Sequence, residues 1–178
     1  MRIVIQRVSR ARVDVVDEQG QPDPDFKPQS IGTGLLLLVA VQDGDGADQV
    51  DYAVRKLTRM RIFADKEGRM NRSILDCGGS ILSISQFTLY ADLRRGNRPS
   101  FMAAGEPQHA QNVWQDLNRA LAATGVPVAE GRFGAHMRVD LVNDGPVTIL
   151  LDTDRLMKKN SRSSGYLTMG RRGADTSS

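Results

Sequence analysis

The sequence predicts a single α/β (α+β-like) domain with a mixed, largely antiparallel and barrel-like β-sheet and two main helices. At 178 residues the chain is long enough for one domain with a sizeable core. Apolar runs of strand type outnumber those of helical type. The two types do not alternate as a regular βαβ repeat, and the sequence has no G-x-G-x-x-G after a strand and no Walker motif. A nucleotide-binding Rossmann fold is therefore excluded.

The first third of the chain is predicted to contain two strands, a loop and a helix. Residues 2–16 alternate between apolar and polar side chains, as a long half-buried strand does. Residues 19–29 hold three prolines among polar residues and are expected to form a loop. The apolar run 31–41 predicts a buried strand. In residues 47–60 the apolar positions recur at helical spacing, which predicts the first helix.

Further along, a short strand is expected at residues 61–63, a turn at 65–68 and another strand at 81–85. The second helix is predicted over residues 107–123, where an apolar stripe ends before Gly125, a typical C-terminal stop.

Residues 143–148 are predicted to form the turn of a hairpin between strands at 137–142 and 147–151. Asn, Asp, Gly and Pro, which occupy the turn, are the residues that tight turns use. The pair at its centre has a second possible use. Gly145 has no side chain, and Pro146 has no amide hydrogen and a locked φ. Such a pair could bring bare carbonyls close to a ligand and select that ligand by its shape.

Arg7 lies on the apolar parity of the first strand, which is unusual for a charged residue. In a regular strand its guanidinium points inward and needs carbonyl or carboxylate partners. A β-bulge that returns the side chain to solvent is an equally good interpretation.

The formal net charge is only +3, but the basic residues cluster. Arg94, Arg95 and Arg98 form one group, and a second crowds the C-terminus: Arg155, Lys158, Lys159, Arg162, Arg171 and Arg172. Basic clusters are typical of proteins that bind nucleic acid. A solvated surface with a disordered tail beyond Thr153 explains the same charges.

Composition narrows the class of protein further. No apolar run is long enough for a membrane span or a signal peptide, and Cys77 is the single cysteine. We therefore expect a soluble, cytoplasmic protein without disulfides. His109, His136 and Cys77 show no metal-ligand spacing, so neither a metal nor another cofactor is expected.

Ser85, Gln86, Phe87 and Thr88 follow the end of a predicted strand. Exposed amides and a hydroxyl at a strand end could hold a carbonyl oxygen, as an oxyanion hole does. Good strand formers without a functional role would give the same pattern. There is no G-x-S-x-G elbow and no base near Ser85 or Thr88 in the sequence. Any catalysis is therefore expected to use backbone groups, hydroxyls, water or the substrate itself.

Seven segments occur in the order found in D-aminoacyl-tRNA deacylases: Ile5-Gln6-Arg7-Val8, Arg61-Ile62-Phe63, Gly78-Gly79-Ser80, Ser85-Gln86-Phe87-Thr88-Leu89, Arg98-Pro99-Ser100-Phe101, Gly131-Arg132-Phe133 and Val142-Asn143-Asp144-Gly145-Pro146-Val147-Thr148. The chain resembles this family over residues 1–152. The resemblance implies a homodimeric proofreading hydrolase. Its substrate would be aminoacyl-tRNA carrying a D-amino acid or mischarged glycine, and its product the free amino acid.

The resemblance also implies roles for particular residues. Gly145 and Pro146 would form a cis peptide that enters the partner subunit's active site and excludes L side chains, with Arg7 supporting it from beneath. The amino-acid pocket would be lined by Ser85, Gln86, Phe87 and Thr88, and Phe133 would lie where the terminal adenosine binds.

Thr88 has two possible roles under this resemblance, nucleophile or positioning group. We favour positioning, with the 2′-hydroxyl of the terminal adenosine assisting, because the sequence shows no base beside Thr88.

The expected organisation is therefore a deacylase domain at residues 1–153 and a basic tail at 154–178. The tail lies outside the resemblance and is hypothesised to add nonspecific attraction to tRNA. Two alternatives are a non-catalytic RNA-binding module and a relative with a trans Gly-Pro bond and an altered editing range.

Overall fold

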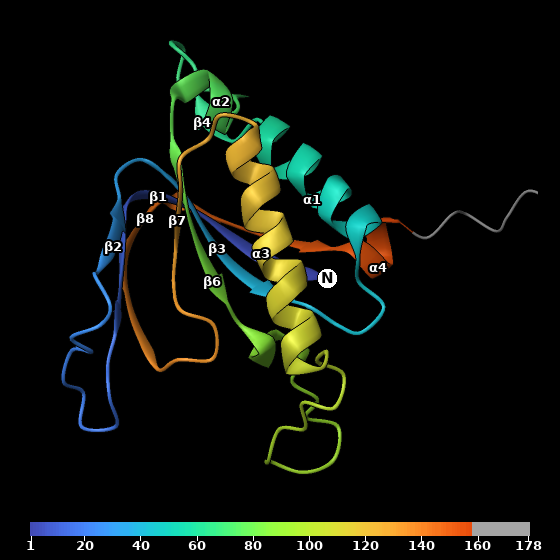
Figure 1. Ribbon diagram of the computed structural model, residues 1–178. Coiled ribbons are helices and arrows are strands. Elements are labelled where there is room, and N and C mark those ends of the chain that lie inside the picture. Colours follow the sequence, from blue (N-terminus) through green and yellow to red (C-terminus); the bar gives the residue numbers. More distant parts are fainter. Residues whose placement is uncertain (158–178) are drawn as a thin grey trace, which may run out of the picture.

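The computed structural model describes residues 1–157, and Figure 1 shows their arrangement. The elements in chain order are β1 (Arg2–Val15), β2 (Gln29–Ile31), β3 (Gly34–Ala40), α1 (Ala47–Arg59), β4 (Phe63–Ala64), β5 (Met70–Arg72), α2 (Ile74–Cys77), β6 (Ser80–Ser85), the 3₁₀ helix η1 (Phe87–Tyr90), α3 (Pro107–Ala123), β7 (Val128–Glu130), β8 (Met137–Asp152) and α4 (Thr153–Leu156).

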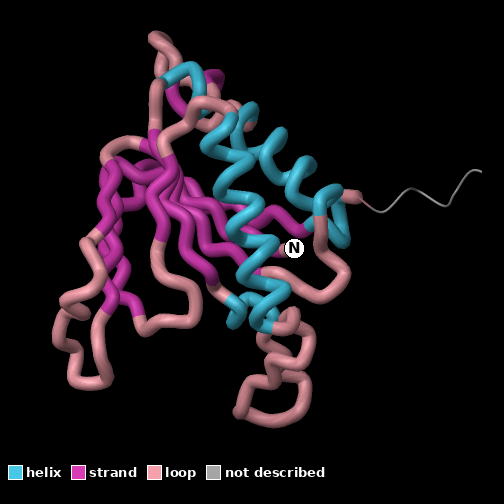
Figure 2. Tube along the Cα trace, viewed as in Figure 1, coloured by secondary structure: helices cyan, strands magenta, loops and turns pink. Residues whose placement is uncertain are grey.

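Six of the strands form one mixed sheet. Its order is β2-β1-β3-β6-β7, in which β3 pairs with the first half of β1 and β2 with the second half. The strand β8 lies off this path and pairs with β1 along its length. The strand β1 is antiparallel to β2, β3 and β8, whereas β3–β6 and β6–β7 are parallel. The long helices α1 and α3 lie side by side over one face of this sheet (Figure 2). The predicted fold class, a mixed barrel-like sheet with two main helices, is confirmed.

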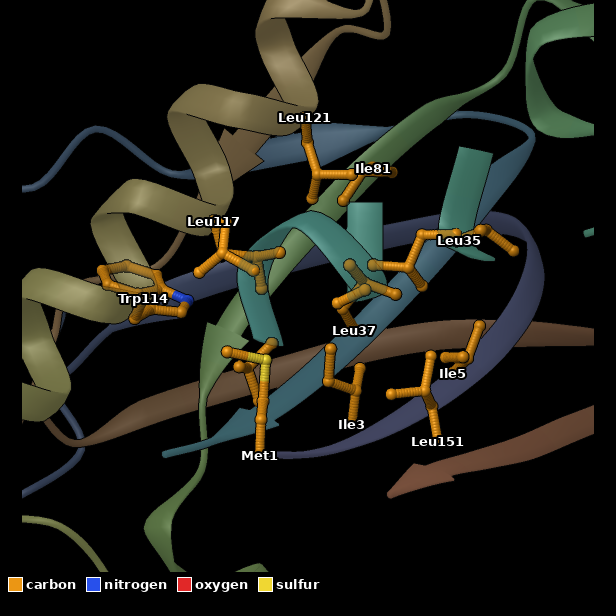
Figure 3. Packing of buried hydrophobic residues seen from close by; sticks show 14 of the residues in the cluster. Met1, Ile3, Ile5, Leu35, Leu37, Ile81, Trp114, Leu117, Leu121 and Leu151 are labelled. Atoms are coloured by element: carbon orange, nitrogen blue, oxygen red, sulfur yellow. The ribbon is translucent and has the colours of Figure 1, made fainter. Parts of the chain in front are cut away.

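The sheet has an apolar core on each face. On the helix side, buried side chains of β1, β3 and β6 meet those of α1 and α3, as Figure 3 shows for Ile3, Leu35, Trp114 and Leu117. On the other face a smaller cluster forms where the sheet curls over itself: Val8, Ala11, Val13, Leu36, Leu82 and Ile84. Both faces are buried, which explains why β3 is a continuous apolar run.

The helix α3 has the bounds that the sequence predicts, and its apolar stripe is buried. Trp114 contributes a polar contact to this stripe, since its indole Nε1 donates to Ser83 Oγ at 2.9 Å. Trp114 is 3% exposed and Ser83 is fully buried. This hydrogen bond joins α3 to the centre of β6.

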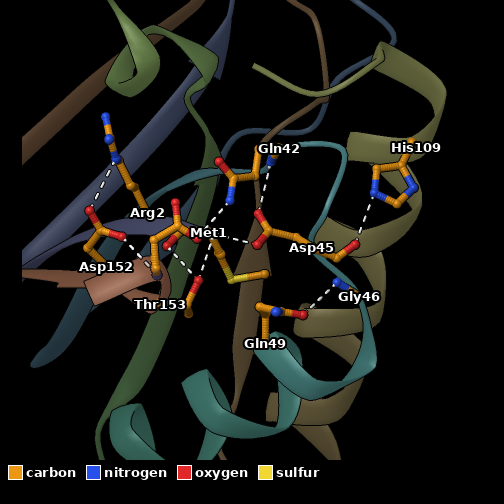
Figure 4. A network of polar contacts seen from close by, with 10 residues as sticks. Met1, Arg2, Gln42, Asp45, Gly46, Gln49, His109, Asp152 and Thr153 are labelled. Carbon is orange, nitrogen blue, oxygen red and sulfur yellow. Dashed lines mark hydrogen bonds and ion pairs between the residues drawn. The ribbon is translucent and has the colours of Figure 1, made fainter. Parts of the chain in front are cut away.

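A buried polar network joins the start of β1 to two other segments (Figure 4). The Met1 ammonium donates to Asp45 Oδ1 at 2.5 Å and to Thr153 Oγ1 at 2.8 Å. Asp45 Oδ2 also accepts from Gln42 N at 2.9 Å. His109 Nε2 lies 3.0 Å from Asp45 O, so this ring contacts the network at the start of α3. The network fixes the connection that follows β3.

The predicted hairpin turn at residues 143–148 is wrong. Both halves of β8 pair antiparallel with β1, so the chain does not reverse direction. Between the pairs Gln6–Thr148 and Val8–Asn143, four residues of β8 lie opposite the single residue Arg7. The turn-forming residues therefore make a large bulge within the single strand β8. The bulge stays within the strand because β1 is long enough to pair with β8 before and after it.

Smaller differences concern short elements. The predicted strand at residues 31–41 is divided between β2 and β3 by a bend, and the strand predicted at 61–63 begins at Phe63. The sequence did not predict α2, β7, η1 or α4. In the described residues no helix has the length and hydrophobicity needed to cross a membrane. Of the tail predicted from residue 154, residues 158–178 lie outside the described residues.

Ser83→Ala should lower the free energy of unfolding by about 1–3 kcal/mol, because it leaves the buried Trp114 N–H without an acceptor. Urea denaturation measures this difference. In a Trp114→Phe background the same substitution should cost much less, since no donor remains. An equal cost in both backgrounds would show that the hydrogen bond is not the cause.

Candidate active site

A cavity of about 600 Å³ opens at the carboxyl ends of the parallel strands β3 and β6. Its volume is in the range of small-molecule sites. Ser85, Gln86, Phe87 and Phe133 border it, so four of the predicted site residues lie together. The other lining residues come from β3, β6, the loop before α3, α3 itself, the loop before β8 and the beginning of β8. Most are apolar: Val39, Ala40, Val41, Ile84, Phe101, Ala110, Trp114, Met137 and Val139.

The rim of the cavity is formed where the chain leaves β6 and enters η1. Gln86 N donates to Val39 O at 2.7 Å, which ends the strand pairing. Phe87 is 58% exposed and packs edge-on against Phe101, with ring centroids 5.1 Å apart. Two aromatic rings from separate segments therefore border the mouth.

The amides of Phe87 and Thr88 are the first two of η1, and the first amides of a helix have no acceptor within it. Among the described residues neither amide donates a hydrogen bond. Two neighbouring free amides at the mouth of an apolar cavity can stabilise a developing oxyanion.

Thr88 is exposed on η1 and does not border the cavity directly. Its Oγ1 accepts a short hydrogen bond from Gln86 Nε2. This amide is a donor and cannot take a proton from the hydroxyl. Within the described residues Thr88 therefore has no hydrogen-bonded base.

Arg2 supports η1, a role that the sequence did not predict. Its Nη1 donates to Leu89 O at 3.0 Å, and its guanidinium lies 4.5 Å from the centroid of the Tyr90 ring. Asp152 Oδ2 is 3.4 Å from Arg2 Nε. Burial raises the pKa of the Tyr90 phenol, so this residue stays neutral beneath the rim.

Phe133 lies in the loop that precedes β8, with its ring 6.1 Å from that of Trp114. The neighbouring Arg132 is held by the proline-containing loop: its Nη1 is 2.5 Å from Asp23 Oδ2. The same guanidinium lies 5.2 Å from the centroid of Phe26. The backbone amide of Asp25, and to a lesser extent Arg132, lower the pKa of Asp23. This loop therefore buttresses the segment that carries Phe133.

Gly145 and Pro146 are exposed and are joined by a cis peptide bond, the isomer that the family resemblance implies. Gly145 has φ of +138°, a conformation that L side chains rarely adopt. A Cβ at this position would lie 2.7 Å from Val147 Cγ2 and 3.0 Å from Arg7 Nη2. Glycine is therefore required by the backbone and by the close approach of Arg7.

Arg7 lies opposite the bulge and beneath it. Its Nε donates to Asp144 O at 2.8 Å and its Nη1 to Ile62 O at 2.5 Å. The side chain is 13% exposed, and Asp144 Oδ2 lies 3.6 Å from Nε. The prediction that an inward Arg7 needs carbonyl partners is confirmed. The pairing is also irregular here, with extra residues in β8 opposite Arg7 and one extra residue of β1 between Val8 and Arg10, but the guanidinium stays covered.

Asn143 closes the bulge with its side chain, which sequence reasoning did not identify. Its Oδ1 accepts from Val147 N at 2.8 Å, and its Nδ2 donates to Thr148 Oγ1 at 3.0 Å. An Asn that bonds to backbone a few residues ahead is a local signal for such a loop.

The predicted site residues thus form two separate groups. Arg2 contacts η1 at the cavity, whereas Arg7 contacts the Gly-Pro segment. The two arginines are five positions apart on an extended strand, roughly 17 Å. No residue of the bulge borders the cavity. Figure 1 shows β4, next to Ile62, at the opposite end of the domain from the start of α3.

Metal ligation has no support in residues 1–157, where no group of three or more His, Cys, Asp or Glu side chains could hold an ion. Cys77 is a free thiol that contacts Ile74 O at 3.4 Å. His136 lies on the rim of the cavity, and His109 contacts the buried polar network instead.

An apolar cavity with free amides at its mouth is an arrangement suited to hydrolysis of a small ester. The sequence model described as D-Tyr-tRNA(Tyr) deacylase matches residues 4–152. The chain belongs to this family.

Relatives named D-aminoacyl-tRNA deacylase are similar over nearly their whole length. One from Bifidobacterium longum (strain NCC 2705) is 59% identical over 162 residues, which cover 91% of this chain and 100% of the relative. One from Bifidobacterium adolescentis is 62% identical over 157 residues, covering 88% of this chain and 99% of the relative.

Two solved structures share the fold. One, titled c-Myc DNA Unwinding Element Binding Protein, has a TM-score of 0.75 and 35% identity, covering 85% of this chain and 98% of the other. A probable eukaryotic D-amino acid tRNA deacylase has a TM-score of 0.68 and 19% identity, covering 84% and 97% of the two chains. The second likeness shows the fold alone.

Arg7→Lys should lower the free energy of unfolding by about 1.5–3 kcal/mol, because an ammonium cannot bond to both the Asp144 and Ile62 carbonyls in the forked geometry of a guanidinium. Amide exchange at residues 143–148 should also become faster. Urea denaturation and hydrogen exchange measure the two effects. Arg10→Lys, at an exposed position of the same strand, is the control, and equal effects of both substitutions would contradict the role given to Arg7.

Proposed function

We propose that this protein is a D-aminoacyl-tRNA deacylase, which hydrolyses the ester between a D-amino acid and the 3′ end of tRNA. The observation that carries the proposal is the apolar cavity bordered by Phe87, whose amide and that of the adjoining Thr88 donate to no described residue. The family and its named relatives point to the same substrate class.

In this reaction a water oxygen attacks the acyl carbon and the bond from that carbon to the ribose 3′ oxygen breaks. The electron pair of the carbonyl moves to its oxygen in the tetrahedral intermediate and returns when the bond breaks. The leaving 3′ oxygen takes the proton that the water loses. The amides of Phe87 and Thr88 would stabilise the oxyanion, which is worth most in a site with little water.

Thr88 would position the substrate rather than attack it. Its hydroxyl accepts from Gln86 Nε2 and has no hydrogen-bonded base among the described residues, which supports a positioning role. A nucleophilic hydroxyl needs such a base. The 2′-hydroxyl of the terminal adenosine is placed by the substrate itself beside the ester and would assist the attacking water. Phe133, near Trp114 at the cavity, would stack on the terminal adenine.

Gly145 and Pro146 would exclude L-amino acids from the cavity of a partner subunit. They are exposed and lie away from their own cavity, so a second copy is the natural recipient. A two-fold homodimer would form two equivalent contacts of this kind. An L side chain would meet the segment, whereas a D side chain or the hydrogen of glycine would not. Mischarged glycyl-tRNA would therefore also be hydrolysed.

The free edge of β8 supports self-association. This strand of 16 residues pairs only with β1 in the described part of the chain. Val142 and Leu150 on it are 40% and 56% exposed. A long edge with apolar side chains is usually covered by another surface.

A nucleic-acid-binding protein without catalysis is the rival function, since the basic clusters permit it and one structural relative is named for binding a DNA element. In either case the basic tail would add attraction to tRNA. The rival predicts that the ester survives binding.

Purified protein should release D-tyrosine from D-tyrosyl-tRNA at least about tenfold faster than L-tyrosine from L-tyrosyl-tRNA, a discrimination of ~1.4 kcal/mol. Thr88→Ala should keep kcat/KM for the D-substrate within about tenfold, because the hydroxyl only positions. Single-turnover hydrolysis measures both. An intact D-ester would exclude the deacylase, and a dead Thr88→Ala with unchanged substrate affinity would indicate a nucleophile.

Mixed dimers test whether the Gly-Pro segment acts across subunits. Gly145→Ala should displace the segment through the Val147 contact and raise L-tyrosyl-tRNA hydrolysis by at least about tenfold. Ala135→Trp should fill the cavity, which Ala135 borders. Adding an excess of Ala135→Trp subunits to Gly145→Ala should then suppress the L-activity and keep the D-activity.

Native mass spectrometry should confirm that the mixed dimers form in this experiment. Persistent L-activity in confirmed mixed dimers would place the segment over its own subunit's cavity instead. A strictly monomeric protein would exclude the cross-subunit proposal.

A further inference from the structure

A hairpin with three arginines follows η1. Asp92 and Ser100 close it with two backbone hydrogen bonds, of 2.8 Å from Asp92 N and 2.9 Å from Ser100 N. Residues 93–99 lie between these two positions and are exposed. In Figure 1 this yellow-green segment projects beyond the start of α3. We call residues 92–100 the arginine hairpin.

The three arginines differ in their charge partners. Arg94 is paired with Asp92, with 2.6 Å between Nη2 and Oδ2 and 2.9 Å between Nε and Oδ1. The hydrogen bonds from Arg94 hold the pKa of Asp92 at about 2, so the pair persists at neutral pH. Arg95 and Arg98 make no ion pair or hydrogen bond with any residue from 1 to 157. Within residues 1–157 the hairpin therefore presents two positive charges that have no acidic partner.

The hairpin begins and ends beside the mouth of the cavity. The chain enters the hairpin directly from η1 and leaves it at Phe101, which borders the cavity and packs on Phe87. Two acids near the start of α3 bond to backbone amides: Glu106 Oε2 accepts from His109 N at 2.9 Å, and Asp43 Oδ1 accepts from Glu106 N at 2.7 Å. Among the described residues neither acid pairs with Arg95 or Arg98, so these two guanidiniums are available to a ligand.

We propose that Arg95 and Arg98 bind backbone phosphates of tRNA just upstream of the terminal nucleotide that enters the cavity. The inference rests on the deacylase function, because a 3′ end in the cavity must carry its preceding phosphates past the rim. Guanidinium groups suit this contact, since their planar fork donates to phosphate oxygens in pairs. Arg94 is already neutralised and contributes to the shape of the hairpin instead.

Phosphate contacts have a thermodynamic signature. Each contact releases counterions. The negative slope of the logarithm of the association constant against the logarithm of salt concentration therefore becomes steeper by about 0.7–0.9 per phosphate neutralised. Two contacts should therefore contribute about 1.4–1.8 to the slope for tRNA. A substrate that lacks the upstream phosphates should show no such contribution.

The experiment compares two D-tyrosyl esters, full-length D-tyrosyl-tRNA and 2′(3′)-O-D-tyrosyl-adenosine. Arg95→Gln/Arg98→Gln should lower kcat/KM for the tRNA roughly tenfold and reduce its salt slope by about 1.4–1.8. Hydrolysis of the adenosine ester should be unchanged. Arg55→Gln/Arg59→Gln, which removes the same two charges from exposed positions on α1 that make no ion pair with residues 1–157, is the matched control and should change neither substrate.

Three results would overturn the proposal. Equal losses on both substrates would mean that the hairpin shapes the cavity rather than binding phosphates. An unchanged salt slope for tRNA, or the same loss in the control variant, would mean that these arginines do not contact it specifically. Failure of the deacylase function itself is recognised separately, because the wild-type protein would then leave both esters intact.

Discussion

The pairing of β1 with β8 along the whole of β1 is the constraint on which the rest of the structure depends. It brings residues near both ends of the described chain together and sets the register of the sheet. The same pairing forces four residues of β8 out of line opposite Arg7, because β1 and β8 stay paired on both sides of them. The Gly-Pro segment is thus displayed by a strand rather than by a free loop, which gives it a defined position.

The strand β1 also supports both parts of the site through its arginines. Arg2 contacts the carbonyl end of η1, and Arg7 contacts two carbonyls beneath the Gly-Pro segment. Both guanidiniums donate to backbone carbonyl oxygens. The groups proposed to act on the substrate are also largely backbone groups, so the two arginines hold the main chain that carries them. Selection and catalysis would then depend on the shape of the main chain, and side chains would mainly hold that shape. The arginine hairpin extends this arrangement from the terminal nucleoside to the nucleotides before it.

Much of the fold could be predicted because its periodic segments are long. The bounds of α3 agree at both ends, and those of α1 differ by one residue, since each helix has an apolar stripe with clear stops. The short elements β7, η1 and α4 were missed because three or four residues carry no readable period. The hairpin at residues 143–148 was predicted wrongly because turn-forming residues serve a bulge as well as a reversal. Only pairing with a distant strand distinguishes the two.

By itself the sequence determined the fold class, the two long helices, the odd parity of Arg7 and the family to which the chain belongs. Local periodicity and ordered motifs carry that information without any long-range contact. The tertiary structure alone decided that Ser85, Gln86, Phe87 and Phe133 share one cavity, while Gly145 and Pro146 lie away from it. It also decided which arginines of the hairpin are paired. These facts depend on strand register and on contacts between distant segments, and no spacing along the chain encodes them.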